Sequence, residues 1–373
     1  MGTPHSGRGL GLLLFNLKTD ADADTQGFTT RWIAAIARDP RVEHVVVLTM
    51  YAGRIDVPEN VRVFSLGRER GYSEFRRFFR FYRLLLRALR LHRIDACFSH
   101  MSPIFSVLAG PVLRVARIPL VTWFTHPSLT WKLKVAHRFS TRMVSAVASS
   151  YPYRKDKLVP LGHGIDMDEF PYSPPENEAA KMILCAGRLS SVKGHKTLLR
   201  AVALLQGRQS GDVQVAVVGG PKDAAGERYL GELKQLAREL RIDDFTQFVG
   251  VVPHAEIVGW YRSCTVHVNL TPEGFLDKVA LESMVCGRLC LVANPAFRET
   301  LGIYGDRLLF EHGNPIDLGD KLRWCLSLSG DQRGEIGAYL RQRVMELHSL
   351  DRLADRLVQI LHELREKSLR SQI

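Results

Sequence analysis

The sequence predicts an α/β protein with two doubly wound parallel sheets, and three observations support this prediction. Short apolar runs alternate with helix-length segments along the whole chain, as in parallel sheets covered by helices. The length of 373 residues is typical of two domains rather than one. A proline-rich stretch near the middle, at 171–180, separates two halves that both show this alternation.

The strands are expected at the short apolar runs of each half. In the first half these runs are 10–16, 44–49, 95–99, 119–124 and 144–148. In the second half they are 182–186, 213–219, 247–249, 266–270, 289–293 and 307–310. We expect an N-terminal domain over 1–170, a hinge over 171–180, a C-terminal domain over 181–350 and a last helix over 351–373. The pattern of that last helix does not indicate which domain it packs on.

The composition is that of a globular protein, which excludes disorder, collagen and coiled coil, but the charge is uneven. Of the formal net charge of +12, residues 1–172 carry +11, with 25 basic and 14 acidic side chains. Residues 173–373 carry +1. This asymmetry favours an anionic partner for the first half, and nucleic acid, an anionic membrane surface and phosphorylated substrates all fit.

The sequence gives no sign of a membrane span or of an exported protein. No stretch approaches the ~20 apolar residues that a span needs. The apolar run 10–17 lacks a small-residue cleavage site, so we expect a first strand there rather than a signal peptide. The six cysteines form no CxxC pair, which predicts buried thiols in a reducing cytoplasm.

The turn 187–194, between an expected strand and an expected helix, contains two glycines and two cations, Gly187, Gly194, Arg188 and Lys193. A diphosphate at this helix N-terminus would meet free N–H groups and the positive end of the helix dipole. Arg188 could bind it bidentately, and Lys193 would add a point charge. The alternative is a solvated loop with surface cations.

Two glutamates mark a second segment, 270–287, which follows a strand and becomes a helix. Glu273 lies at the end of the strand, and Glu282 lies within an apolar stretch of the helix. A buried carboxylate needs a partner, because burying it unpaired costs several kcal/mol. The hydroxyls of a ribose fit that need, and an ion pair from Glu282 to Lys278 at helical spacing is the alternative.

Taken together, these residues resemble the retaining family 4 glycosyltransferases of the GT-B fold, in which two Rossmann-like doubly wound domains face across a cleft. The resemblance covers nearly the whole chain and follows the order and spacing of several motifs. They are GHGID at 162–166, GR and KG within 187–194, VVGG at 217–220, FVG at 248–250 and EGF with the second glutamate at 273–282.

The resemblance implies a nucleotide-sugar donor in the C-terminal domain. Arg188 and Lys193 would hold the diphosphate, Glu282 the ribose hydroxyls, and Glu273 the transferred sugar. The donor-binding residues expected are Gly187, Arg188, Lys193, Gly194, Glu273, Gly274, Phe275, Asp277, Lys278 and Glu282. The catalytic residues expected are His126, Arg188, Lys193 and Glu273.

One departure affects the assignment of the first glutamate. The family pattern has seven residues between the two glutamates, whereas eight separate Glu273 from Glu282 here. Either an inserted residue makes the loop bulge, or Asp277 and Lys278 take over part of the sugar contact.

In the first domain, His126 follows a strand and matches a histidine that the family places near the reacting sugar, where a structural cap is the alternative. The loop from Asn16 to Gly27 is where family members meet the acceptor. Its Asp20, Asp22 and Asp24 look like a DxD metal motif. We reject a metal there, and we expect no cofactor, because GT-B enzymes neutralise the leaving diphosphate with cations and a helix.

A basic helix is predicted at 74–93. Its arginines step by four, three, four and three, so that one face carries Arg76, Arg80, Arg83, Arg87 and Arg90. The rest of the helix is aromatic and aliphatic, which fits an anionic membrane interface. The alternative is a domain helix with its arginines in water. No nucleic-acid module is recognisable, so a nucleic-acid partner is not expected.

The function expected from the resemblance is transfer of a hexose from a UDP- or GDP-sugar to an acceptor hydroxyl, with retention at the anomeric carbon. A lipid-linked or growing polysaccharide acceptor fits the basic first half, in a cytoplasmic enzyme peripheral on the inner face of the cell membrane. The alternatives are a nucleotide-sugar epimerase, an inverting transferase, and a catalytically weak protein that serves as a membrane or assembly partner.

Overall fold

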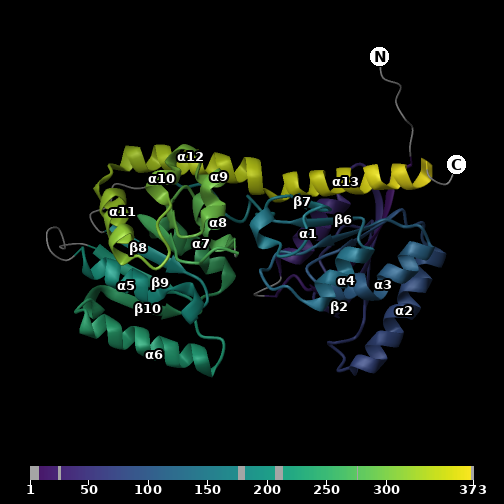
Figure 1. Cartoon of the computed structure of the whole chain (residues 1–373), viewed down its shortest axis with the longest axis horizontal. Helices are drawn as coiled ribbons and strands as arrows, with labels where there is room; N and C mark the ends of the chain where they lie inside the picture. Colours follow the sequence, from purple (N-terminus) through teal and green to yellow (C-terminus); the bar gives the residue numbers. More distant parts are fainter. Residues whose placement is uncertain (1–7, 24–26, 175–180, 206–212, 275, 371–373) are drawn as a thin grey trace, which may run out of the picture. The chain divides into compact units, whose positions relative to one another are not determined.

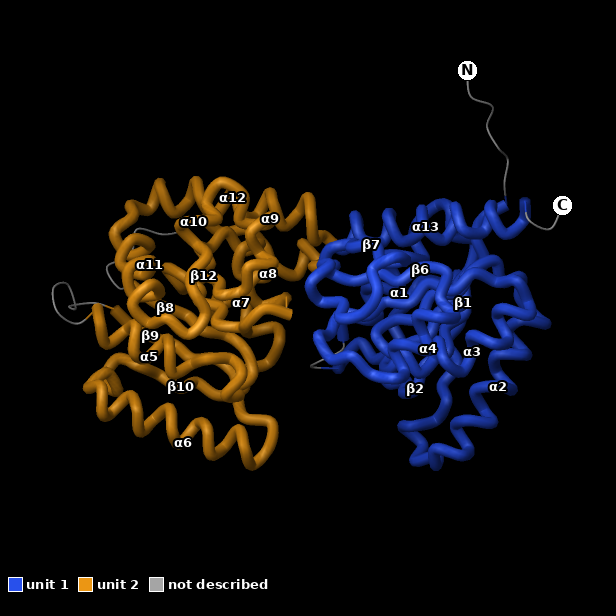
Figure 2. The backbone as a smooth tube through the Cα atoms, in the orientation of Figure 1, with its two compact units in different colours: residues 1–164, 350–373 blue, residues 165–349 orange. Residues whose placement is uncertain are grey.

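The computed structural model describes residues 8–23, 27–174, 181–205, 213–274 and 276–370. They form two compact units, one made of residues up to Gly164 and from Leu350 onward, the other of Ile165–Ser349 (Figure 2). Each unit is an α/β layer structure around a parallel sheet (Figure 1). The predicted fold class, two doubly wound α/β domains, is confirmed.

The first unit contains a seven-stranded sheet in the order β3-β2-β1-β4-β5-β6-β7. Its strands are β1 (Leu10–Thr19), β2 (Val42–Ala52), β3 (Val61–Ser65), β4 (Ala96–Ser99), β5 (Leu120–Trp123), β6 (Arg142–Ser145) and β7 (Leu158–Pro160). Its helices are α1 (Phe28–Ala37), α2 (Glu74–Leu91), α3 (Pro103–Val115), α4 (Trp131–Phe139) and α13 (Leu350–Arg370). The central strands are apolar on both faces because helices cover both sides of the sheet.

The last helix, α13, belongs to the first unit, which answers the question that its sequence pattern left open. It packs on α1 and β4. An ion pair of 2.6 Å joins Arg41 to Asp355, and the Arg365 guanidinium donates to the carbonyl of Arg8 at 3.0 Å. The chain therefore passes between the units twice, at Gly164–Ile165 and at Ser349–Leu350.

The second unit contains a five-stranded sheet in the order β10-β9-β8-β11-β12. Its strands are β8 (Lys181–Ala186), β9 (Val213–Val218), β10 (Thr246–Gly250), β11 (Val266–Asn269) and β12 (Leu289–Val292). Its longer helices are α5 (His195–Ala203), α6 (Ala224–Glu239), α7 (His254–Ser263), α8 (Lys278–Val285), α11 (Pro315–Ser327) and α12 (Gly330–His348). Two short helices, α9 (Arg298–Leu301) and α10 (Gly305–Leu308), lie between β12 and α11.

Three details differ from the sequence prediction. The run 307–310 is not a strand, because α10 occupies its first half and only Leu309 makes a single bridge, to Val292. The edge strands β3 and β7 were not expected, since both are short and only partly buried. The units divide at 164/165 rather than at 170/171.

The start of the predicted hinge is attached to the second unit. The Arg288 guanidinium donates to the carbonyl of Ser173 at 2.8 Å, and that of Arg341 donates to the carbonyl of Phe170 at 3.1 Å. Residues 175–180 of the predicted hinge lie outside the described residues.

The strand order reverses once in each sheet, between β1 and β4 and between β8 and β11. In doubly wound sheets ligands bind at this switch point, at the carboxyl ends of the strands. In the second unit, the loops that leave β8 and β11 carry most of the residues that the sequence singled out. No helix among the described residues is long and apolar enough to cross a membrane.

Candidate donor-binding site

The loop after β8 has the geometry of an anion-binding site. It makes one turn of 3₁₀ helix, η2 (Ser191–Lys193), before α5 begins at His195. Gly194 is the N-cap, in a left-handed conformation (φ 71°) that favours glycine, and it has no side chain with which to cap the helix. The hydroxyl of Tyr229, on α6, accepts hydrogen bonds from the backbone N–H groups of His195 and Lys196. The start of α5 therefore offers the loop the positive end of its dipole rather than free N–H groups.

The two cations of this loop lie in different surroundings. The Arg188 side chain is exposed, and within the described part of the chain it has no ion-pair partner. The Lys193 side chain is three-quarters buried, and its ammonium pairs with Asp277. Arg188 can therefore turn towards an anionic ligand, whereas Lys193 is held in place.

Asp277 immediately precedes α8, and three donors converge on one oxygen of its carboxylate. The Lys193 ammonium, the Thr271 hydroxyl and the Asn269 amide all donate to Oδ2, the last at 3.1 Å. Lys193 also donates to Thr271 at 3.0 Å. Burial alone would raise the pKa of Asp277, but Lys193 and these hydrogen bonds outweigh it and lower the pKa below its ordinary value.

Glu282 is buried inside α8, and its partner is a residue that sequence reasoning missed. The hydroxyl of Tyr261, on α7, donates to Glu282 Oε2 at 2.9 Å, and the Tyr261 side chain is fully buried. Burial raises the pKa of Glu282, although the Tyr261 hydrogen bond and the charge of Lys278 oppose the rise. No local signal marks Tyr261, because it is 21 residues away on another helix.

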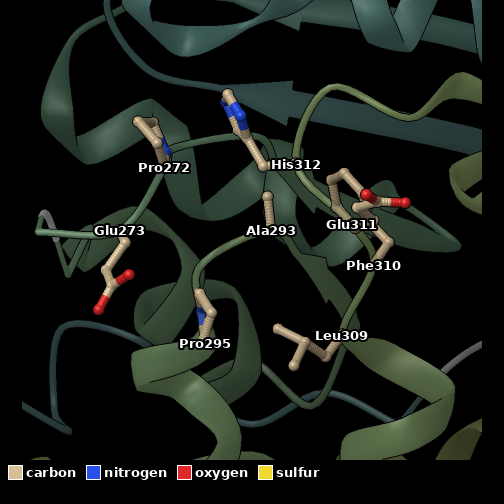
Figure 3. A pocket seen from close by; sticks show the side chains of 8 residues that line it. All are labelled: Pro272, Glu273, Ala293, Pro295, Leu309, Phe310, Glu311 and His312. Atoms are coloured by element: carbon tan, nitrogen blue, oxygen red, sulfur yellow. The ribbon is translucent and has the colours of Figure 1, made fainter.

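Glu273 lines a cavity of about 460 Å³ at the ends of β11 and β12 (Figure 3). The lining residues are Pro272, Glu273, Ala293, Pro295, Leu309, Phe310, Glu311 and His312. Nε2 of His312 lies 3.8 Å from the point that a Cβ on Gly194 would occupy, so the cavity adjoins the start of α5. Glu273 itself is exposed, Gly274 has a φ of 96°, and Phe275 lies outside the described residues.

Two buried histidines lie close to the loop and were not singled out from the sequence. His267, on β11, accepts the N–H of Ala186 at 3.3 Å, and burial lowers its pKa to about 3. His195 begins α5, and burial, together with the charge of Lys193, lowers its pKa to about 4. Both rings are neutral at physiological pH, so neither adds charge to the loop.

The residues predicted on the acceptor side lie at the carboxyl edge of the first sheet. Asn16 is buried near the end of β1, and its amide donates to the carbonyl of Lys18 and to Thr19, so it serves its own strand. Gly27 is the N-cap of α1. His126 is exposed after β5, and its Nδ1 accepts the N–H of Ser128 at 3.1 Å, a contact within the loop between β5 and α4.

The acidic loop is neutralised by neighbouring cations. Asp20 pairs with Lys18 at 3.2 Å and accepts the backbone N–H of Arg54. Asp22 accepts two hydrogen bonds of 2.9 Å from the Arg54 guanidinium. Asp24 lies outside the described residues. The carboxylates of Asp20 and Asp22 are thus occupied within the protein.

Helix α2 presents three faces around its circumference. A buried face, Phe81, Leu84, Leu85 and Ala88, packs on the sheet. At 3.6 residues per turn, an exposed stripe lies beside the buried face. This aromatic stripe consists of three phenylalanines and one leucine, Phe75, Phe78, Phe79 and Leu86, with exposures of 73%, 43%, 56% and 43%. The arginine stripe comes next, made of Arg76, Arg80, Arg83, Arg87 and Arg90.

Comparison with known proteins gives a family match for part of the chain and a fold for nearly all of it. Residues 166–343 match the family model of the glycosyl transferases group 1. A D-inositol 3-phosphate glycosyltransferase of Corynebacterium jeikeium (strain K411) is 34% identical over 161 residues, which are 43% of this chain and 38% of that protein. The chain thus spans only about a third of the length of the curated relatives that it matches.

Solved structures are similar over nearly the whole chain. HepE from Anabaena, solved in complex with UDP, has a TM-score of 0.72 at 18% identity, covering 95% of this chain and 100% of that chain. A sucrose-phosphate synthase from Thermosynechococcus elongatus has a TM-score of 0.72 at 17% identity, covering 95% and 99%. At these identities the likeness is one of fold, and the predicted GT-B fold is confirmed.

Proposed function

Since residues 166–343 match the family model of the glycosyl transferases group 1, we propose that this protein is a glycosyltransferase that moves a hexose from a nucleoside diphosphate sugar to an acceptor hydroxyl. One observation carries the proposal. The start of α5, with Gly194 as its N-cap, and the exposed Arg188 lie after β8, and the buried carboxylate of Glu282 lies on the helix that follows β11. These groups flank the switch point of the second sheet and match the diphosphate and ribose of such a donor.

The chemistry that this site can perform is stabilisation of a departing diphosphate. Negative charge develops on the phosphate as the bond to the sugar breaks, and Arg188, Lys193 and the α5 dipole can stabilise it. The leaving phosphate can accept the proton of the acceptor hydroxyl, so the reaction needs no protein base and retains the anomeric configuration. His126 would position the sugar. No metal is required, because the cations are side chains.

The donor is a UDP- or GDP-linked hexose in this proposal. Similar folds have been solved with UDP and with UDP-glucose, which makes UDP-hexoses the first donors to test. Glu273 and the cavity beside α5 would receive the hexose, because that cavity adjoins the expected diphosphate position.

The acceptor is a lipid-linked or growing glycan in this proposal, and α2 is its membrane contact. Helices that bind anionic bilayers place arginines at the headgroups and aromatic side chains below them. The arginine and aromatic stripes of α2 lie side by side and provide both parts. This arrangement would place the enzyme on the inner face of the cell membrane, as a peripheral protein.

Vesicle sedimentation tests the membrane contact. We expect binding to vesicles that contain about 30% anionic lipid, little binding to neutral vesicles, and loss of binding in Phe75→Ser/Phe79→Ser. Ile303→Ser, which removes an equally exposed apolar side chain from the second unit, is the matched control. Equal binding to neutral and anionic vesicles would contradict the proposal.

Turnover of a donor panel tests the transferase itself. UDP- and GDP-hexoses are incubated with wild type and with Arg188→Ala, and slow hydrolysis or transfer to glycan acceptors and to D-inositol 3-phosphate is measured. We expect one donor to be consumed and the substitution to weaken both binding and turnover. An inverted product would favour an inverting transferase, an isomerised donor an epimerase, and no turnover a non-catalytic assembly role.

A further inference from the structure

We propose that Asp277 is a positioning residue that fixes the Lys193 ammonium at the start of α5, and thereby sets where positive charge meets the donor diphosphate. This inference rests on the proposed function and deepens it. Neither residue type nor spacing indicates the pairing, because the two residues are 84 positions apart.

The pairing is built by four side chains from both sides of the switch point. Lys193 ends η2 after β8, whereas Asn269, Thr271 and Asp277 come from the end of β11 and the loop that follows it. Thr271 and Asn269 are almost fully buried, which fixes the two groups that donate to Asp277. The carboxylate is therefore held by Thr271 and Asn269 at Oδ2, the same oxygen that accepts from the ammonium.

The charges explain why this contact affects turnover more than binding. An anion beside the diphosphate repels it, and the ion pair cancels most of the attraction that Lys193 would otherwise provide. Arg188 and the α5 dipole then remain to attract the diphosphate. Asp277 instead fixes the position of the Lys193 ammonium. A lysine side chain is flexible and has many rotamers, whereas its charge must lie beside the leaving oxygen as the bond to the sugar breaks.

The expected signature is a split between kcat and binding. In Asp277→Asn the anion is lost, so UDP or GDP should bind as tightly as in wild type or more tightly. The turnover number should fall by about 100-fold, the scale of a catalytic group displaced by about 1 Å. A merely structural role would weaken binding and turnover together. Asp277→Glu, which keeps the charge, should recover part of the loss.

A double-mutant cycle tests whether Asp277 acts through Lys193. The donor turnover and nucleotide affinity of wild type, Asp277→Asn, Lys193→Ala and the double variant are compared. If the proposal holds, Asp277→Asn adds nothing in the Lys193→Ala background. Losses that multiply, or an Asp277→Asn enzyme with wild-type kcat, would overturn it.

Two controls separate this proposal from folding defects and from the proposed function. If Asp277→Asn fails to fold, Thr271→Val is the second variant, because it removes one of the hydrogen bonds that hold Asp277. It should also lower kcat without weakening nucleotide binding, and its loss of kcat should be smaller. Wild-type protein that turns over no nucleotide sugar overturns the proposed function itself. Active wild type with multiplicative losses overturns only the role of Asp277.

Discussion

Replacing Glu282 by glutamine should improve folding stability and impair nucleotide binding at the same time. Glutamine has nearly the same shape, and its amide oxygen can still accept the 2.9 Å hydrogen bond from Tyr261. The substitution removes only the charge. Because burial raises the pKa of Glu282, the ionised carboxylate costs folding free energy at pH 7, and glutamine does not carry that cost.

The sign and size of each effect follow from the same contacts. A group whose folded pKa is raised destabilises the fold above that pKa, so the advantage of glutamine should be largest at pH 7 and vanish below pH 4.5. Hydrogen bonds from ribose hydroxyls to a carboxylate are worth about 1.5–3 kcal/mol each, against about 1 for a neutral acceptor. We therefore expect UDP or GDP to bind about 10- to 100-fold more weakly.

Urea unfolding at pH 7 and pH 4.5, together with calorimetric titration of UDP and GDP, measures both quantities. Glu282→Ala is the contrasting variant, because it leaves the buried Tyr261 hydroxyl without its acceptor and should lose about 1–3 kcal/mol of stability. A Glu282→Gln variant that binds nucleotide as tightly as wild type would refute the ribose contact. A stability loss of more than about 1 kcal/mol in that protein would show that the charge itself supports the fold.

Three further predictions concern stability and metal dependence. The pKa values of about 3 for His267 and about 4 for His195 lie below the ordinary 6.5. The fold should therefore lose about 2 kcal/mol of stability for each ring as the pH falls from 7 to 5. A His267→Gln variant whose stability, measured by urea unfolding, keeps the same pH dependence would contradict this. Arg288→Met removes the hydrogen bonds from a buried guanidinium to the carbonyls of Tyr261, Arg262 and Ser173. The free energy of unfolding should fall by at least ~3 kcal/mol in the same assay. A fall of less than ~1 kcal/mol would mean that water replaces these hydrogen bonds. Donor turnover should survive a chelator, because Asp20 and Asp22 are engaged by Lys18 and Arg54; activity lost to chelator and restored by a divalent cation would refute that.

The fold could be predicted because each strand of the sheet interiors is a short apolar run between helix-length segments. The exception at 307–310 shows the limit of this pattern. Its Leu308 and Phe310 are buried in the core, and Leu309 is half-buried beside the cavity. The end of a helix can bury such an apolar run as well as a strand does. The edge strand β3 was missed for the opposite reason, since Arg62 points to solvent and four of its five residues are not fully buried.

The site was predictable only where its chemistry is local in the sequence. Gly194 and the start of α5 could be recognised, since a glycine N-cap before an amphipathic helix occupies one stretch of chain. The partners of Lys193 and Glu282 could not, because Asp277 and Tyr261 reach them from other loops and helices after the sheet has formed. Spacing alone reveals which residues share an element, not which side chains meet between elements.

The irregular spacing between the two glutamates has a physical meaning in this arrangement. Glu273 stays exposed beside the cavity, while Asp277, immediately before α8, reaches Lys193 across the switch point. The loop thus carries two carboxylates with different surroundings, one open to a ligand and one already committed to a cation. A carboxylate bound by three donors keeps its charge, because its lowered pKa holds it ionised well below neutral pH. Under the proposed function, sugar selection at Glu273 and phosphate geometry at Lys193 would therefore depend on separate residues, and a substitution at one should leave the other role intact.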